Sequence, residues 1–515
     1  MPSIDEMNER SDGPRDSVDG QRHKSFREIL WNTGIIGGSS IANLMFSVVR
    51  SKVFAVLVGP GGVGLLGIYG SVLATASQLS TMGLGTAGTR QIASAYAGED
   101  SAAELGDVWK AVRRLATILG LTGAIALVAA SPLVARLVLG EQTQWWIVAV
   151  LAVGVAATVG SNALTALLTG IRHIGDVARA RVLAGGLTTA IGIAVIAAFR
   201  MRGILPVVIA APLVTFGVLL VFARRLSVWR LTERSRGWRR EVPVVFRLGA
   251  AIMFGGLVTV GTGLVIRTAV LHQLGIESVG FFQASWSISV GYVGLVLTAM
   301  GTDYFPRLSG IIAQKETAVE MVNDQAEVAL LVAGPVILGM TALGSILLRI
   351  LYSSKFEPAL PMLQWQMLGN VFKVASWPLG FVVLALGRGG LFFVLEAAWC
   401  TVFAGLALMR LSEGGLAMIG IAFLASYCFY IFVLHLIGRK LIGFRWRPSV
   451  IVLIGVCVLL TGSALLSNLF APSWAPFYGG AVTILFGVWC GRRLLRGSDL
   501  TLHEIGRRMG RRPRR

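Results

Sequence analysis

Charged residues are scarce in this sequence. Asp, Glu, Lys and Arg make up only 14% of its 515 residues, whereas hydrophobic residues make up 55%. Soluble domains carry about a quarter charged residues, so a soluble fold of this length would lack the polar surface that it needs. With a mean hydropathy of +0.73, the sequence predicts an all-α polytopic membrane protein.

Residues suited to catalysis or metal binding are also sparse. The four cysteines fall within apolar runs, where free cysteine acts as a small buried hydrophobe, and their spacing fits neither a disulfide framework nor a metal site. The five histidines are scattered, with no HExxH arrangement. We therefore expect no metal, no cofactor and no enzymatic activity. The cysteines are Cys400, Cys428, Cys457 and Cys490.

Long hydrophobic runs are what the chain has in abundance. A helix of about 20 residues crosses the ~30 Å of hydrocarbon in a bilayer, and runs of this length recur from Ile29 onward. The runs predict fourteen spans, near residues 30–57, 64–84, 112–131, 145–168, 181–199, 204–223, 248–274, 279–300, 326–348, 361–385, 391–409, 416–438, 449–468 and 474–491.

The spans group into two lobes with polar segments around them. The expected layout is a disordered cytoplasmic tail (1–28), an N-lobe of six spans (29–223), a basic cytoplasmic linker (224–247), a C-lobe of six spans (248–438), two extra helices (439–491) and a basic cytoplasmic tail (492–515).

The basic residues predict the orientation of these spans. Of the 46 Lys and Arg residues, 36 fall on the side of the N-terminus, six on the other side and four within spans. Because cytoplasmic loops carry the excess of cations, both termini should be cytoplasmic. The net charge of +20 then indicates contact with anionic membrane lipids, and no nucleic-acid partner is expected.

An internal repeat links the two lobes. Arg50 lies thirteen residues before a Val-Gly pair that ends at Gly64, and Arg267 lies twelve residues before the Val-Gly pair that ends at Gly280. Six helices separate the copies, so both have the same membrane orientation. The pattern predicts a parallel repeat of two six-helix lobes around an axis along the membrane normal.

Four cations fall within the predicted spans, namely Arg50, Lys52, Arg267 and Lys373. A charge at the centre of a span costs at least ~2.5–3.5 kcal/mol, so such residues normally face a bundle interior or a watery cavity. The alternative is that a long side chain near a helix end reaches the headgroups, which applies most to Arg50 and Lys52. All four are candidate substrate-binding cations.

Another four charged residues are candidates for gating or ion coupling. Glu396 lies five residues into its span, where it is interfacial, paired with Lys373 or Arg388, or a proton carrier. Asp303 ends its span and stands four residues before Arg307, as in a helix-end ion pair. Arg90 follows the second span in the place that Arg307 has in the second copy.

Further polar and aromatic side chains within the spans fit substrate contact and helix packing equally well. They are Asn43, Gln78, Asn162, Gln283, Trp286, Asn370 and Trp377.

The segment Ser51–Ala93, SKVFAVLVGPGGVGLLGIYGSVLATASQLSTMGLGTAGTRQIA, resembles the opening of O-antigen translocases. These are lipid-linked oligosaccharide flippases of the multidrug/oligosaccharidyl-lipid/polysaccharide exporter superfamily. The shared features are a cation before an Ala-Val pair, a Gly-Pro-x-Gly-x-Gly turn and a glycine-rich end to the second span. The resemblance covers roughly Ile35–Gly140, and fourteen spans exceed the twelve of some family members.

The resemblance implies a V-shaped pair of lobes, like that of the superfamily's multidrug exporters, which alternates between inward- and outward-facing states. The implied substrate is a polyprenyl-diphosphate-linked oligosaccharide moved to the outer face of a bacterial inner membrane, with polysaccharide polymerase or assembly proteins as partners. Arg50 and Lys52 from one lobe and Arg267 from the other would clasp the diphosphate, since Arg offers a bidentate fork to phosphate. Lys52 matches a family lysine, whereas Arg267 is assigned through the repeat alone.

Two other functions stay open at this point. The first is a cation-coupled multidrug or metabolite exporter of the same superfamily, although an exporter of cationic drugs is expected to have acidic residues in its cavity. The second is a non-transporting membrane scaffold for polysaccharide assembly, which has no need of intramembrane cations in both repeats.

Overall fold

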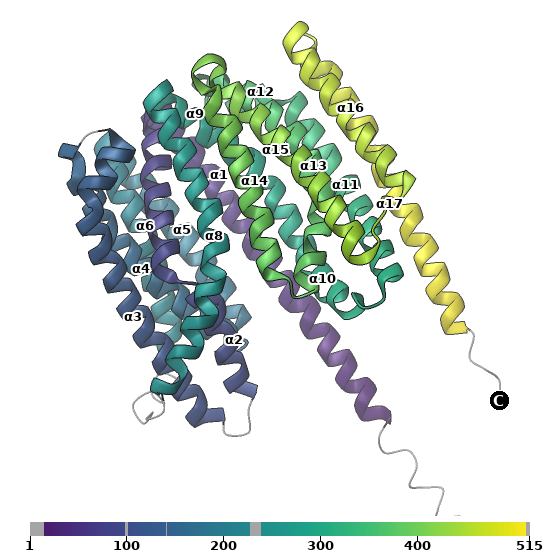
Figure 1. Cartoon of the computed structure of the whole chain (residues 1–515), viewed down its shortest axis with the longest axis horizontal. Coiled ribbons are helices and arrows are strands. Elements are labelled where there is room, and N and C mark those ends of the chain that lie inside the picture. The colour runs from purple at the N-terminus through teal and green to yellow at the C-terminus, as the bar shows by residue number, and fades with distance from the viewer. Residues whose placement is uncertain (1–14, 98–100, 141, 227–237, 511–515) are drawn as a thin grey trace, which may run out of the picture.

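The computed structural model describes residues 15–97, 101–140, 142–226 and 238–510, and over these residues it is almost entirely helical, with no strand (Figure 1). This confirms the predicted all-α class. The helices are α1 (Arg15–Thr81), α2 (Leu84–Ala97), α3 (Ser101–Val134), α4 (Trp145–Gly170), α5 (Ile174–Phe199), α6 (Ile204–Arg224), α8 (Trp238–Leu274), α9 (Ile276–Trp286), α10 (Val293–Ile311), α11 (Lys315–Ala342), α12 (Gly344–Leu351), α13 (Leu360–Ala385), α14 (Gly389–Met409), α15 (Leu411–Ile442), α16 (Pro448–Phe470) and α17 (Ala475–Gly510).

Among the described residues, eleven segments are long and apolar enough to cross a membrane. Two of them, Gly38–Thr81 and Ile174–Arg224, contain 44 and 51 residues. At 1.5 Å per residue each is more than twice as long as the ~30 Å hydrocarbon layer. Each is also interrupted, α1 by the non-helical Gly59 and the second by a short 3-10 turn at Arg200–Gly203. The chain is therefore a multi-pass membrane protein in which both segments cross twice.

Helix extends beyond the predicted spans in three places. Residues 15–28 of the predicted disordered tail belong to α1, residues 238–247 of the predicted linker belong to α8, and α17 continues to Gly510. Extending an existing helix avoids the costly nucleation step, which is why polar sequence next to a membrane helix continues it. The remainder of the first tail, residues 1–14, lies outside the described part of the chain.

Figure 1 shows the helices in two groups. Helices α3, α4 and α6 lie on one side of α1 and α8, and α11, α13 and α15 lie on the other, with α16 and α17 outermost on that side. The N-terminal end of α1 and the C-terminal end of α17 lie on the same side of the bundle. One buried cluster surrounds Trp109 and Leu167 in the first group, and another surrounds Phe356 and Leu363 in the second. A further cluster joins the two groups, with Leu151 of α4 and Phe423 of α15 among its members.

The two glycine turns of the internal repeat pack directly against each other. Gly59 (φ 64°, ψ −170°) and Gly275 (φ 83°, ψ 172°) share a backbone conformation that only glycine adopts readily. Each turns its chain sharply into the next helix. The six-residue segment that begins at each glycine is here called a hairpin, 59–64 in the first copy and 275–280 in the second.

The contact between the hairpins has two-fold character. A Cβ atom on Gly64 would lie 2.2 Å from the carbonyl oxygen of Ile276, and one on Gly280 would lie 2.0 Å from that of Pro60. Gly64 is equivalent to Gly280 in the repeat, and Pro60 to Ile276, so each hairpin makes the same contact with the other. Only glycine permits this approach of two backbones.

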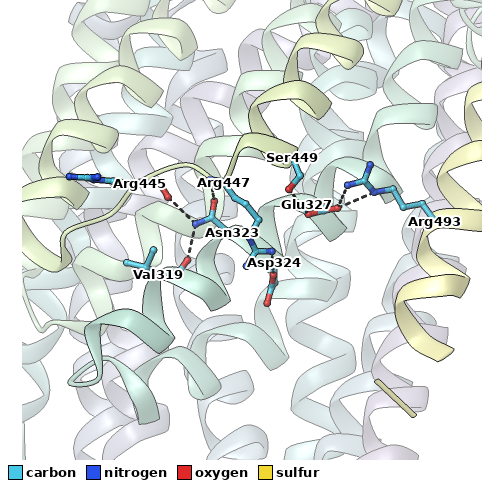
Figure 2. Close-up of polar contacts among 8 residues, drawn as sticks. All are labelled: Val319, Asn323, Asp324, Glu327, Arg445, Arg447, Ser449 and Arg493. Atoms are coloured by element: carbon cyan, nitrogen blue, oxygen red, sulfur yellow. Dashed lines mark hydrogen bonds and ion pairs between the residues drawn. The ribbon is translucent and has the colours of Figure 1, made fainter. Parts of the chain in front are cut away.

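Polar contacts hold the last two helices on the second group (Figure 2). Glu327 of α11 accepts hydrogen bonds from the guanidinium of Arg493 in α17, at 3.0 Å from Nε and 2.5 Å from Nη2. The amide of Asn323 donates to the Arg445 carbonyl at 3.1 Å and accepts from the Arg447 amide at 2.8 Å. Helices α16 and α17 are thus attached to α11 beyond simple apolar packing.

Candidate functional site

A cavity of about 910 Å³ lies between the two groups of helices. Both membrane-crossing halves of α1 contribute to it, together with α4, α6, α8, α9 and the π-helical turn Ser287–Tyr292. Its lining runs along the second half of α1 from Val63, next to the hairpin contact, to Thr81 at the far end of that helix. The paired hairpins therefore lie at one end of the cavity.

The charge of this cavity is entirely positive. Arg50 and Arg267 line it, and the other described lining residues include no Asp or Glu. Two of the four predicted intramembrane cations, one from each copy of the repeat, thus face the same space. An anionic ligand would find two cations here and no repelling carboxylate among the described lining residues.

Arg267 is fixed in place without an acidic partner. Its side chain is 9% exposed, and its Nε and Nη2 atoms donate to Gln283 Oε1 at 3.2 and 3.0 Å. Nη1 donates to the Gly263 carbonyl at 3.0 Å, and the guanidinium lies 4.9 Å from the ring centroid of Phe282. These neutral acceptors and the aromatic face orient the group but leave its charge uncompensated.

Arg50 is half-buried in the first half of α1. No ion pair connects it to a carboxylate of the described residues, so its charge is also available to the cavity. Unlike Arg267, it donates no hydrogen bond to a neutral acceptor among the residues that the structure describes.

Lys52 is placed differently. Its ammonium donates to the Arg349 carbonyl at 2.7 Å, and Lys52 is not among the lining residues of the cavity. Arg349 itself pairs with Glu357. Lys52 therefore ties the first half of α1 to α12, close to the hairpins, rather than joining Arg50.

Lys373 lies in a separate, smaller pocket of about 240 Å³ within the second group of helices. Its ammonium lies 5.8 Å from the ring centroid of Tyr427. Glu396 lines the same pocket and accepts a hydrogen bond of 2.7 Å from the Tyr430 hydroxyl. Pairing with Lys373 was one of the alternatives for Glu396. The two side chains line the same pocket, but no ion pair within 4.0 Å joins these two described residues.

A column of aromatic rings connects the central cavity to this smaller pocket. Neighbouring ring centroids along it lie 5.0–5.9 Å apart. Arg267 lies over the ring at one end and Lys373 over the ring at the other. In order, its members are Phe282, Trp286, Phe403, Trp399 and Tyr427.

The remaining predicted gating residues lie at the surface. Asp303 and Arg307 form the expected helix-end pair, with 3.0 Å between Arg307 Nη1 and Asp303 Oδ2, and both are largely exposed. Arg90 is exposed on α2. None of the three lines the central cavity.

The polar and aromatic side chains that fit substrate contact and helix packing equally well in the sequence differ in their places in the structure. Gln78, Asn162, Gln283 and Trp286 line the central cavity, whereas Trp377 lines the smaller pocket. Asn43 and Asn370 are used in packing: the first donates to the Ser39 carbonyl and the second to the Ser289 carbonyl.

Tyr352 is a lining residue that the sequence did not indicate. It lies in the connection after α12, far along the chain from the rest of the cavity, and its side chain is 5% exposed. Burial raises the pKa of its hydroxyl to about 12, so the group stays neutral as a hydrogen-bond donor. No local pattern signals a contact that depends on how a distant loop folds back.

Three comparisons relate the sequence and the fold of this chain to known proteins. A family model described as polysaccharide biosynthesis protein matches residues 53–361. The Lipid III flippase of Escherichia coli (strain K12) is 22% identical over 415 residues, covering 78% of this chain and 95% of the flippase.

Solved structures agree on the fold. An inward-facing multidrug resistance MATE family transporter of the MOP superfamily superimposes with a TM-score of 0.66 at 18% identity, over 78% of this chain and 94% of that one. The lipid II flippase MurJ in an inward closed conformation gives 0.63 at 13% identity, over 91% and 100%. The predicted superfamily fold is confirmed.

Proposed function

Because the chain belongs to the polysaccharide biosynthesis protein family, we propose that it is a flippase for a polyprenyl-diphosphate-linked oligosaccharide, such as an O-antigen or other surface polysaccharide repeat unit. The observation that carries the proposal is the central cavity, which has Arg50 and Arg267 and no carboxylate among its described lining residues. The proposed location is the bacterial inner membrane, with both termini cytoplasmic.

The chemistry of a diphosphate fits this cavity. Its negative charge cannot enter a low-dielectric space without compensation, and guanidinium groups offer the charge together with paired N–H donors. Arg267, held by Gln283, would supply a preorientated fork, and Arg50 a mobile second cation from the other repeat. In this scheme Lys52 supports the hairpin region instead of binding the phosphate.

The rest of the substrate has matching surroundings. Amides and hydroxyls such as those of Gln78, Asn162 and Ser71 line the cavity and can exchange hydrogen bonds with sugar hydroxyls. The polyprenyl chain would stay in the bilayer while the head group crosses with the cavity.

Alternating access follows from the glycine hairpins. In the described state they touch at one end of the cavity. This end lies on the side away from the start of α1 and the end of α17 (Figure 1). Separation of the hairpins would open that side, and the two-fold contact gives both repeats an equal part in the seal.

A multidrug exporter of the same fold is the second candidate, supported by the likeness to MATE transporters. The positive cavity argues against it for cationic drugs, which would meet two uncompensated arginines. A scaffold without transport leaves the same two arginines without a role.

Reconstituted vesicles test the proposal. Purified protein is placed in liposomes with a fluorescent polyprenyl-diphosphate oligosaccharide, and the fraction of label that a membrane-impermeant quencher reaches is followed with time. We expect the protein to equilibrate the label between leaflets, the Arg50→Gln/Arg267→Gln variant to do so far more slowly, and Lys52→Gln to retain most activity. Transport of a cationic dye without movement of the lipid would overturn the proposal in favour of drug export.

A further inference from the structure

A second large concavity lies on the outer flank of the first helix group, away from the central cavity. Its volume is about 960 Å³. Helix α4 forms its floor with small residues such as Ala156 and Gly160, while α3 and α6 form its walls with larger apolar side chains such as Ile125 and Phe216. The small residues on α4 leave a groove between two helices that each pack on α4.

This groove faces the surroundings of the bundle rather than its interior. Leu121 and Ile125 of the α3 wall are 57% and 66% exposed, and in a membrane protein exposed apolar residues of a span face lipid. The groove is also separate from the central cavity, because α4 presents Thr158 and Asn162 to the cavity and Ala156 and Gly160 to the groove. Residues two apart lie on nearly opposite sides of a helix.

Positive charge is confined to one end of the groove. Arg113, in the first half of α3, and Arg224, the last residue of α6, line it. Helix α3 begins and α6 ends on the side of the bundle where α1 begins (Figure 1). The other described lining residues include no Asp, Glu, Lys or His. Fifteen residues of α3 separate Arg113 from Val128 near the opposite end, which is about 22 Å of helix.

That length matches one leaflet of a bilayer. Half of the ~45 Å that includes the headgroups is roughly 22 Å, so a lipid with its phosphate at the arginines would end its chains near Val128. A polyprenyl chain is too long to end there, and the positive charge of Arg113 and Arg224 favours an anionic head group over a neutral one.

We propose that this groove binds an anionic phospholipid of the leaflet on the N-terminal side of the bundle. Its phosphate lies between Arg113 and Arg224, and its acyl chains lie along α4 and fill the space between α3 and α6. The bound lipid braces the first helix group. The site does not depend on the transported substrate, because α4 separates it from the central cavity.

Native mass spectrometry of the full chain tests this site. The protein is released from nanodiscs of phosphatidylethanolamine and phosphatidylglycerol, and retained lipids are counted. We expect wild type to prefer phosphatidylglycerol, and Arg113→Gln/Arg224→Gln to lose about 30-fold of that preference at ~1 kcal/mol per cation. The control Arg439→Gln/Lys440→Gln removes two exposed cations on α15 and should behave as wild type.

A second variant keeps both arginines and fills the floor. Ala156→Leu should reduce retention of both lipids while leaving the preference for the anionic head among the lipids that remain. The proposal is overturned if the double arginine variant keeps the wild-type preference. It is also overturned if added polyprenyl phosphate displaces phosphatidylglycerol from wild type but not from Ala156→Leu, since the groove would then hold the longer chain.

Discussion

At the scale of single residues, the site depends on two arginines that are held in different ways. Arg267 has neutral hydrogen-bond acceptors and an aromatic face around it, whereas Arg50 forms no ion pair with the described residues. A carboxylate beside either would cancel the charge that an anion needs. The absence of acids among the described lining residues therefore favours an anionic ligand as much as the presence of the two arginines does.

Replacing Arg267 by Gln should weaken binding of a diphosphate lipid by about 10- to 100-fold, because hydrogen bonds to charged groups are worth ~1.5–3 kcal/mol. Arg267→Lys should recover part of this loss, since the ammonium retains the charge but not the fork. Calorimetric titration with a short-chain polyprenyl diphosphate measures both. If Arg267→Gln binds the lipid as tightly as wild type does, Arg267 is not part of the binding site.

Gln283 offers a sharper test of the same arrangement. Gln283→Glu would place a carboxylate at about the 3.0–3.2 Å that now separates the amide oxygen from Arg267, so the pair should stay folded while its net charge disappears. We expect thermal stability in detergent to be kept and diphosphate binding to be lost. Gln283→Leu should instead lower stability, because two buried N–H groups lose their acceptor at ~1–3 kcal/mol. If Gln283→Glu binds like wild type, the positive cavity is not the basis of recognition.

At the scale of elements, the hairpins and the last two helices decide which parts move together. The hairpins join the two repeats through a contact that two glycines make possible. The polar contacts of Glu327 and Asn323 (Figure 2) fix α16 and α17 to α11. We expect the lobes to separate at the hairpins while α16 and α17 move with the second group.

A methyl group at either hairpin glycine should favour the separated state. Gly64→Ala or Gly280→Ala would place Cβ within 2.2 Å of a backbone oxygen, whereas Cβ at Gly217 has nothing within 4 Å, so Gly217→Ala is the matched control. Pulsed electron paramagnetic resonance between spin labels at Val56 and Glu277, in a cysteine-free background, should show longer distances in the two hairpin variants alone. Unchanged distances would mean that the hairpins are not a gate.

The Glu327–Arg493 pair should contribute more to the stability of the last two helices than the neighbouring Asp324–Arg447 pair does. The Glu327 side chain is 18% exposed and that of Asp324 61%, and exposed pairs contribute little. We expect Glu327→Gln to cost about 1 kcal/mol and to speed hydrogen exchange in α16 and α17, with Asp324→Asn close to wild type. Equal exchange in both variants would show that apolar packing alone holds these helices.

At the scale of the whole molecule, hydrophobic runs and the repeat made the architecture predictable. Long apolar stretches predict membrane helices with little dependence on tertiary context, and the Gly64–Gly280 equivalence predicted from spacing is visible in the structure as a symmetric contact. Arg50 and Arg267 could be paired for the same reason. The different placement of Lys52 and the entry of Tyr352 into the cavity depend on how distant loops fold back, which no local pattern contains.

Orientation is the whole-molecule prediction that follows from charge. The N-terminal end of α1 and the C-terminal end of α17 lie on one side of the bundle, and the sequence predicts that 36 of the 46 cations fall on the side of the N-terminus. Alkaline phosphatase fused at the C-terminus should be inactive and a green fluorescent protein fusion bright. The opposite pattern would invert the direction of the cavity and, with it, the proposed direction of transport.

The central claim is that this chain moves a lipid-linked oligosaccharide through a positive cavity. Its most direct test is the sidedness of that lipid in cells that lack the protein and every redundant carrier, complemented with wild type or with Arg50→Gln/Arg267→Gln. We predict that the intermediate collects on the cytoplasmic leaflet and that wild type alone clears it. If the double variant clears it equally well, the two arginines are not the site, and if no intermediate collects, the substrate class is wrong.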